Sequence, residues 1–183
     1  MASTISAGTT SGTAIAITGD TTGNLAFTTQ AGTYTQTLPN ATGTVMVTGN
    51  MPTFSAYTST NSTLTNNAYT KVNFQTEEYD TNNNFASSRF TPTVAGYYIL
   101  SSTIAFTGPV ITESVIVLYK NGSAFKFGSD IIPTTMYITQ GTWQVYANGS
   151  TDYFEIYVYQ NSARDVNASQ SQSFFTGSMI RSA

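Results

Sequence analysis

The sequence predicts an all-β protein whose short strands form a sandwich or barrel. Short runs of residues alternate between apolar and polar side chains, which is the period of a strand with one buried face. Turn-forming pairs such as Asn121-Gly122 and Asn148-Gly149 separate these runs. No window shows a convincing helical period. Many short strands at regular spacing are typical of sandwiches and barrels.

The strands are expected between residues 51 and 183. In the clearest of them, the aliphatic Ile156 and Val158 alternate with Tyr157 and Tyr159. Asn121-Gly122 joins two expected strands and predicts a hairpin with a type I′ turn. The expected strands are Thr70–Gln75, Tyr97–Phe106, Ser114–Lys120, Ala124–Phe127, Met136–Thr139, Thr142–Ala147, Tyr153–Gln160 and Phe174–Ile180.

The composition provides residues for a hydrophobic core but few charged side chains. Charged residues make up 8% of the chain, against about 25% in ordinary soluble domains. Twelve Tyr and eleven Phe residues supply core material. The net charge is −3 and the six basic residues are scattered, so we expect no nucleic-acid partner. The chain has no His and no Cys, which excludes a Ser-His-Asp triad, a cysteine nucleophile and a histidine-ligated metal.

The first residues, Met1-Ala2-Ser3-Thr4, begin neither a basic segment nor an apolar run. We therefore expect no signal peptide and synthesis in a host cytoplasm. No stretch approaches the ~18 apolar residues of a membrane span, so we expect no membrane partner.

Residues 1–50 differ in composition from the rest of the chain. They contain one charged side chain, Asp20, and two aromatic ones, Phe27 and Tyr34. Their strand-prone runs are too short and polar to offset the entropy of ordering them. Met51-Pro52 makes a suitable boundary, because the residue before proline favours extended backbone. We expect residues 1–50 to be an extended β arm that anchors the 51–183 domain through Ile15, Ile17, Leu25, Phe27, Leu38, Val45 and Val47.

Several segments between residues 52 and 181 resemble the C1q/TNF-like globular head. The segment Phe90–Leu100 matches that family's F-x-P-x-x-x-G-x-Y-x-F pattern, except that Leu100 replaces the last aromatic residue. Four more segments resemble its opening strand, second strand with the following loop, central hairpin and closing strand. They are Pro52–Tyr57, Thr70–Phe74 with Tyr79–Phe85, Val117–Gly122 and Ser173–Ile180.

The resemblance implies a ten-stranded jelly roll that associates as a homotrimer. Pro92 and Gly96 would set a turn between two strands, with Gly96 in a conformation that a side chain would forbid. Gly177 would permit close approach in the final strand. The residues expected to define the fold are Phe90, Pro92, Gly96, Tyr98, Leu100, Gly122, Phe175 and Gly177.

The chain lacks the Gly-X-Y stalk and cysteines of secreted animal members. Its arm, with Gly19–Leu25 and Leu38–Thr44, instead resembles leading segments of tailed-bacteriophage structural proteins. This resemblance implies a virion component, with another virion protein as the partner of residues 1–50.

The only acidic cluster is Glu77, Glu78 and Asp80. With Asn82–Asn84 it could offer oxygen ligands to calcium, but no spaced acidic loop motif supports the metal. A solvated acidic loop is the favoured interpretation. Two carboxylates could serve a glycosidase, yet adjacent strand residues point to opposite faces, so Glu77 and Glu78 would diverge. We therefore expect neither catalysis nor a cofactor.

The row of Tyr153, Tyr157 and Tyr159 could be a sugar-binding platform, a trimer contact or part of the core. The leading interpretation of the whole chain is a non-enzymatic phage virion protein, a trimeric knob that serves as capsid decoration, cement or head fibre. The alternatives are a receptor-binding tail-fibre tip that grips a host surface glycan, a soluble lectin-like module and, last, a glycosidase.

Overall fold

The computed structural model describes residues 49, 51–107, 113–131, 138–162 and 164–183. The predicted arm, with its seven apolar positions from Ile15 to Val47, lies outside the described residues except for Gly49, and its boundary at Met51 stays a prediction. The part of Met136–Thr139 before Ile138 also lies outside them.

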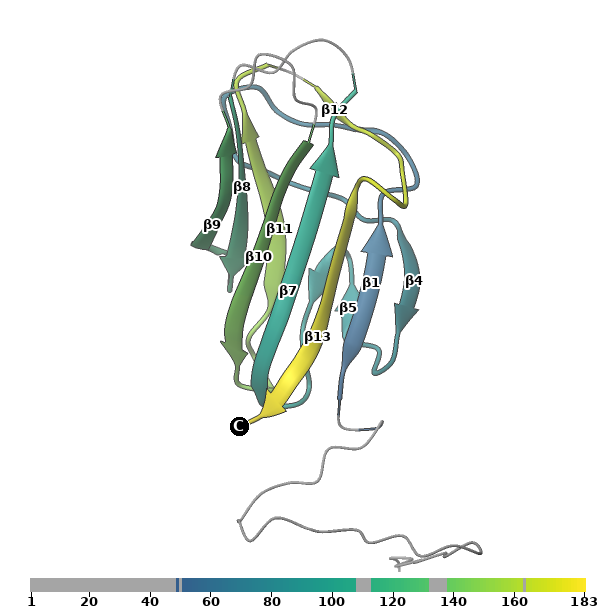
Figure 1. Ribbon diagram of the computed structural model, residues 1–183, viewed down its shortest axis with the longest axis vertical. Coiled ribbons are helices and arrows are strands. Elements are labelled where there is room, and N and C mark those ends of the chain that lie inside the picture. The colour runs from purple at the N-terminus through teal and green to yellow at the C-terminus, as the bar shows by residue number, and fades with distance from the viewer. Residues whose placement is uncertain (1–48, 50, 108–112, 132–137, 163) are drawn as a thin grey trace, which may run out of the picture. The chain divides into compact units, whose positions relative to one another are not determined.

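The described residues form two antiparallel sheets that face each other (Figure 1). The first sheet has the strand order β10-β7-β13-β1-β4. The second has the order β5-β6-β11-β8-β9, with β3 beside β11. Strands that are far apart in the sequence, such as β13 and β1 or β6 and β11, lie side by side in each sheet, as the crossovers of a jelly roll require. The first sheet contains β1 (Thr53–Tyr57), β4 (Thr76–Asp80), β7 (Gly96–Ala105), β10 (Ile138–Ala147) and β13 (Phe174–Ser182). The second contains β3 (Thr70–Lys71), β5 (Phe85–Ala86), β6 (Arg89–Phe90), β8 (Ser114–Lys120), β9 (Ser123–Ile131) and β11 (Phe154–Gln160).

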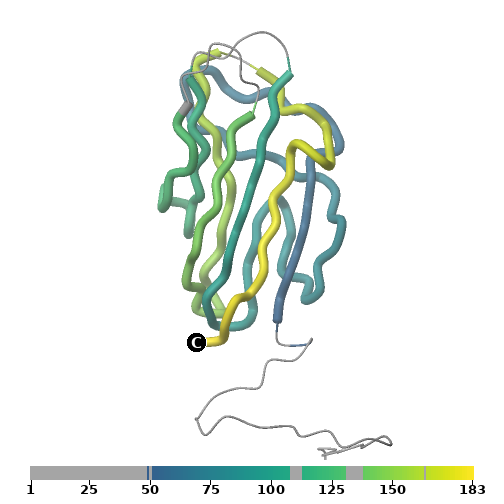
Figure 2. The backbone as a smooth tube through the Cα atoms, viewed as in Figure 1, coloured from purple at the N-terminus to yellow at the C-terminus, as the bar shows by residue number. Residues whose placement is uncertain are grey.

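The two main strand paths hold ten strands, so the all-β jelly roll predicted from the sequence is confirmed. A separate two-stranded ribbon pairs β2 (Ser62–Thr63) with β12 (Asp165–Val166). The first and last strands of the jelly roll lie side by side (Figure 2), with Phe54 opposite Gly177 and Ala56 opposite Phe175.

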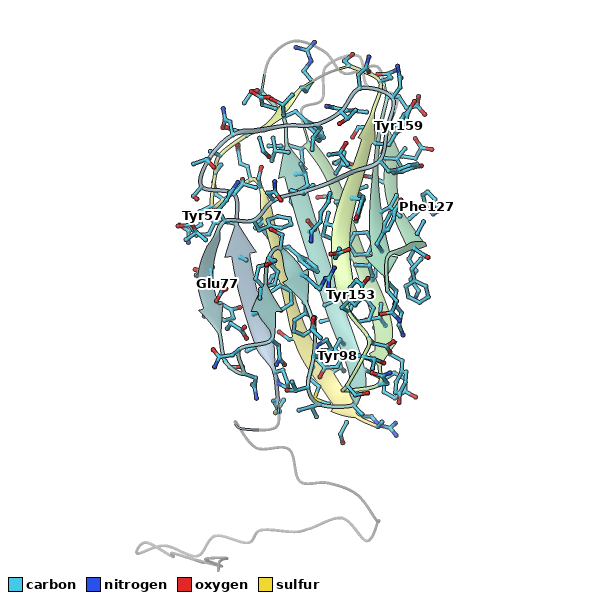
Figure 3. All side chains as sticks on the ribbon, turned by 180° about the vertical axis from the view of Figure 1, so that it is seen from behind. Tyr57, Glu77, Tyr98, Phe127, Tyr153 and Tyr159 are labelled. Carbon is cyan, nitrogen blue, oxygen red and sulfur yellow. The ribbon has the colours of Figure 1, made fainter. Side chains whose placement is uncertain are left out.

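Aromatic rings fill the space between the sheets. Phe54 stacks on Phe85 and Phe90, with ring centroids 5.0 and 4.3 Å away, and meets the edge of Phe175 at 4.9 Å. Phe54, Phe90 and Phe175 are fully buried. Tyr98 packs edge-on against Phe90 and points into the molecule (Figure 3). The predicted fold-defining positions Phe90, Tyr98 and Phe175 are therefore buried, as are Leu100 and Pro92.

Tyr98 is buried with its hydroxyl group donating to the Val94 carbonyl oxygen at 2.6 Å. Burial raises the pKa of Tyr98 from 10.0 to about 12. The folded state therefore holds this proton more tightly than the unfolded chain. The corresponding stability is fully present below pH 10 and is lost as the pH rises from about 10 to about 12.

We expect the free energy of unfolding to fall steeply across that alkaline range, and less steeply in Tyr98→Phe. Other tyrosines titrate there too, so the substitution should reduce the fall without removing it. Urea denaturation at a series of pH values measures both curves. Identical slopes for the two proteins would contradict this account of Tyr98.

Two predicted glycines are required for space. A Cβ atom on Gly177 would overlap the Leu100 side chain and lie 2.8 Å from Cε1 of Phe54. A Cβ atom on Gly96 would overlap the Met179 side chain and the Arg181 carbonyl oxygen. The prediction that Gly96 adopts a conformation forbidden to side chains was wrong, because Gly122 and Gly149 are the positive-φ glycines among the described residues.

The two Asn-Gly turns are tied to each other through Asp152. Asn121 and Gly122 have φ values of 53° and 80°, as a type I′ turn requires, which confirms the hairpin between β8 and β9. The Asp152 carboxylate accepts hydrogen bonds from the Asn121 side chain at 2.9 Å and from the Asn148 backbone at 3.0 Å. It also pairs with Lys120 at 2.8 Å. Burial alone would raise the pKa of Asp152, but these bonds hold it below its ordinary value.

Two segments differ from the sequence-based prediction. Only Thr70–Lys71 of the expected strand Thr70–Gln75 pairs with a neighbour. Val72 and Phe74 are still buried, and the Val72 N–H donates to the Ile156 carbonyl oxygen at 2.9 Å, so their alternation reflects core packing beyond the paired residues. The expected acidic loop instead begins with β4, which pairs with β1 and contains both Glu77 and Glu78.

Candidate binding surfaces

The acidic residues near β4 do not converge on one point. Glu77 and Glu78 are exposed strand residues, and the register shift between Ser55 and Ala56 leaves Glu78 without a partner position in β1. Asp80 instead closes the following turn, because its carboxylate accepts the backbone N–H of Phe85 at 2.7 Å and that of Asn82 at 3.3 Å. Across the described ranges, no three His, Cys, Asp or Glu side chains are grouped so as to hold a metal.

A belt of tyrosines covers the outer face of the second sheet. Its predicted members Tyr153, Tyr157 and Tyr159 are all half-buried, and Figure 3 shows Tyr153 and Tyr159 on this face. Tyr157 stacks on Tyr119 with ring centroids 3.8 Å apart, and Tyr159 lies 5.4 Å from the exposed Tyr69. Each ring thus has a separate neighbour. We call Tyr69, Tyr119, Tyr153, Tyr157 and Tyr159 the tyrosine belt.

The tyrosine belt covers apolar side chains on the outer face of the sheet. Val115 and Val117 of β8 are opposite Tyr159 and Tyr157 of β11, and both valines are buried although they face away from the main core. Burial, followed by the nearby Glu155 carboxylate, raises the pKa of Tyr157 above its ordinary value. The belt therefore has a packing role as well as an exposed rim.

A buried carboxylate lies at the centre of the belt. Glu155 is 3% exposed, and its Oε1 atom accepts Lys71 Nζ at 2.7 Å and Arg89 Nε at 2.9 Å. The Arg89 guanidinium also lies 3.8 Å from the centre of the Tyr153 ring. These charges come from β11, β3 and β6. They are far apart in the sequence, and no local pattern indicated that they meet.

A hollow between β7, β9 and β10 is lined by uncharged groups. Ser101 and Thr142 share a hydrogen bond of 2.7 Å in its wall. The lining offers hydroxyl groups, an amide and one ring, so it holds no side chain that titrates near neutral pH. Its residues are Ser101, Ser102, Thr103, Gly128, Ser129, Gln140, Gly141, Thr142 and Phe174.

Exposed aromatic residues gather with basic ones along β9 and β10. Tyr97 lies 5.5 Å from Tyr146, and the Arg181 guanidinium lies 5.8 Å from the Tyr97 ring centre. Lys126 lies 5.5 Å from the Phe125 ring centre and donates to the Gln144 carbonyl oxygen of β10 at 2.6 Å. We call this set the basic-aromatic flank: Tyr97, Phe125, Lys126, Phe127, Tyr146 and Arg181. Sequence reasoning missed it, because its members come from four strands.

The described residues include no helix long and apolar enough to cross a bilayer. No protein-family model matches the sequence, and no curated protein matches it.

Solved structures with a similar fold include murine APRIL, which shares 12% sequence identity with a TM-score of 0.53 over 71% of this chain and 99% of that chain. The globular domain of the zebrafish complement 1qA protein shares 16% identity with a TM-score of 0.54, over 72% and 98% of the two chains. Eiger TNF from S. frugiperda shares 10% identity with a TM-score of 0.50, over 73% and 93%. The chain therefore has the C1q/TNF-like jelly-roll fold that the sequence motifs predicted.

Proposed function

We propose that this chain is a non-enzymatic structural component of a bacteriophage particle. Residues 51–183 form a trimeric knob, and residues 1–50 attach the knob to another virion protein, either the major capsid protein or a tail component. Capsid decoration, cement or a head fibre is the role that we favour. The protein would be made in the host cytoplasm and function in the virion.

The observation that carries this proposal is the completeness of the jelly roll without the arm. Within the described residues, the buried core begins at Phe54 and closes where β13 pairs with β1. Residues 1–50 are thus available for a separate task. Their Thr-rich, β-prone runs suit strand addition to a neighbouring sheet. Their resemblance to leading segments of tailed-phage proteins supports a virion as the place of attachment.

Self-association is supported by the apolar side chains that the knob exposes. Tyr97 and Ile99 of β7 are 48% and 38% exposed, and Phe127 of β9 is 60% exposed. Exposed patches of this kind mark interfaces. C1q/TNF-like heads associate in threes, so we assign these residues to a homotrimer. Since few charges are available, packing should dominate the association and salt should screen little of it.

A non-enzymatic role agrees with the chemistry of the described surfaces. The hollow between β7, β9 and β10 offers no general acid or base. Asp80 is engaged with backbone N–H groups, and Glu155 with two cations. These carboxylates are thus occupied in holding the fold.

A protein that starts at Met51 tests the division of roles. We expect it to trimerise and melt cooperatively, as the full chain does, but to bind knob-free particles at least about a hundredfold less. Co-sedimentation with particles measures attachment, and light scattering in low and high salt measures the trimer. The full chain is the matched control. Equal decoration by both proteins would place attachment in the jelly roll and overturn the proposed role of the arm.

The tyrosine belt favours a second candidate, a receptor-binding tail-fibre tip. The exposed Tyr69 ring at the rim of the belt has the shape and chemistry to stack on a host surface glycan. In that case the Met51 protein should still bind host cells, and Tyr69→Ala should reduce this binding. Loss of cell binding on removal of residues 1–50 would place receptor recognition in the arm and contradict this candidate.

A further inference from the structure

Two opposite flanks of the knob carry opposite charge. β4 and β9 lie at opposite sides of the sandwich in Figure 1, and Figure 3 shows Glu77 and Phe127 on opposite sides. The β4 side is acidic, with Glu77 and Glu78, whereas the β9 side carries Lys126. Charge is therefore distributed unevenly across the width of the knob.

The basic-aromatic flank has the composition of an interface. Four of its side chains are large and exposed: Tyr97, Phe125 and Tyr146 at 44% to 48%, and Phe127 at 60%. Its cations, Lys126 and Arg181, form no ion pair with any described residue. Aromatic rings beside cations are favoured in recognition of a partner that brings carboxylates and rings.

The β4 flank offers such groups. Glu77 and Glu78 are exposed and form no ion pair within the described part of the chain. The adjacent Tyr79 is 45% exposed. The bulge at Glu78 disfavours the pairing of another strand with this edge, so we expect a partner to contact its side chains. We call Glu77, Glu78 and Tyr79 the acidic flank.

Five other charged residues of the knob pair with one another. Lys71 and Arg89 pair with Glu155, and Lys120 pairs with Asp152. Asp130 lies on β9 with Lys126, but four positions along a strand is about 13 Å. That separation exceeds the Debye length of about 8 Å at physiological salt. The charge of Asp130 therefore does not cancel that of the basic-aromatic flank.

We propose that the basic-aromatic flank of one copy binds the acidic flank of the next copy. This inference rests on the proposed trimer and states which sides of the knob meet in it. Neither flank can pair with itself, because like charges would face each other. A contact between two different patches is heterologous, and three such contacts close a ring when each contact turns the next copy by a third of a turn. The aromatic side chains exclude water from the contact, while the charges select the register in which the two flanks meet.

Charge reversal of one flank at a time tests the pairing. Lys126→Glu with Arg181→Glu makes both flanks acidic, and Glu77→Lys with Glu78→Lys makes both basic. We expect each double variant to need a concentration at least about tenfold higher to assemble. The quadruple variant has both flanks reversed in one chain, so it should trimerise again. Its recovery would also show that the substitutions leave the fold intact, which melting curves of every variant check independently.

Mixing the two double variants gives a sharper result. All contacts between unlike variants are attractive, but a ring of three cannot alternate between two kinds of subunit. We therefore expect one-to-one dimers in native mass spectrometry and few closed trimers. Glu113→Lys with Asp130→Lys is the control, since it changes net charge as Glu77→Lys with Glu78→Lys does but leaves the acidic flank unaltered. This control should remain trimeric.

The outcomes separate this inference from the proposed function. A monomeric wild-type knob would overturn the trimer itself. A trimeric wild type whose double variants assemble equally well would overturn only the pairing of these flanks. Failure of the quadruple variant to assemble, although it is folded, would also overturn the pairing.

Discussion

Gly177→Val is expected to destabilise the knob by about 3 kcal/mol or more, near the upper range for overpacking of a core. The new side chain would enter space occupied by Leu100 and the Phe54 ring, with its Cβ atom 2.8 Å from Cε1 of Phe54. Both neighbours are fully buried, and Phe54 is held by three other rings. Neither side chain can move aside cheaply. Urea denaturation of the full chain measures the change.

Gly49→Val provides the matched control, because nothing lies within 4 Å of a Cβ atom there. It should change the unfolding midpoint little. Leu100→Ala combined with Gly177→Val should cost less than the sum of the two single changes, since the smaller side chain leaves room for the valine. Strict additivity would show that the contact with Leu100 does not limit this position.

Glu155→Ala is expected to cost about 3 kcal/mol, the lower end of the range for breaking a buried ion pair. The lower end applies because the two cations that it leaves, Lys71 and Arg89, are 26% and 42% exposed and can be hydrated. Lys71→Met should cost less than Glu155→Ala, since Arg89 still satisfies the carboxylate. Thermal and urea denaturation of the three proteins give the comparison.

Replacing all three charged residues with methionine is expected to recover most of that loss, because no charge is then left unpaired under the tyrosine belt. The signal of near-ultraviolet circular dichroism should meanwhile report the packing of Tyr153, which the Arg89 guanidinium covers. If Glu155→Ala is as stable as the wild type, the buried carboxylate contributes nothing and this account of the belt is wrong.

The sequence was informative where a strand has one apolar and one polar face. The alternation around Tyr98 and Leu100 placed β7 correctly, and the Asn121-Gly122 turn located the hairpin of β8 and β9. The family-like motif identified Phe90 and Phe175 as core residues because their spacing is shared across that fold. Local periodicity and turn chemistry carried these predictions.

The sequence was misleading where the conformation or environment of a residue depends on contacts with distant strands. β4 is acidic and its side chains are exposed, so it lacks the alternation that identifies a strand; its pairing with β1 decides its conformation. Gly96 is required because Met179 and Arg181 lie beside it in the neighbouring strand, which no local pattern could indicate. Glu155 is likewise defined by cations from other strands. Such features depend on sheet topology and could not be read from neighbouring residues.

The pairing of β1 with β13 determines when the chain can fold. Thr53 and Ser178 share a hydrogen bond although they are 125 positions apart. Phe54 cannot be covered until β13 has been synthesised. Most of the knob therefore emerges from the ribosome before its core can close. Contacts between distant residues also make folding slow. Until then, the exposed aromatic residues can promote aggregation, and chaperones are the natural protection during that interval.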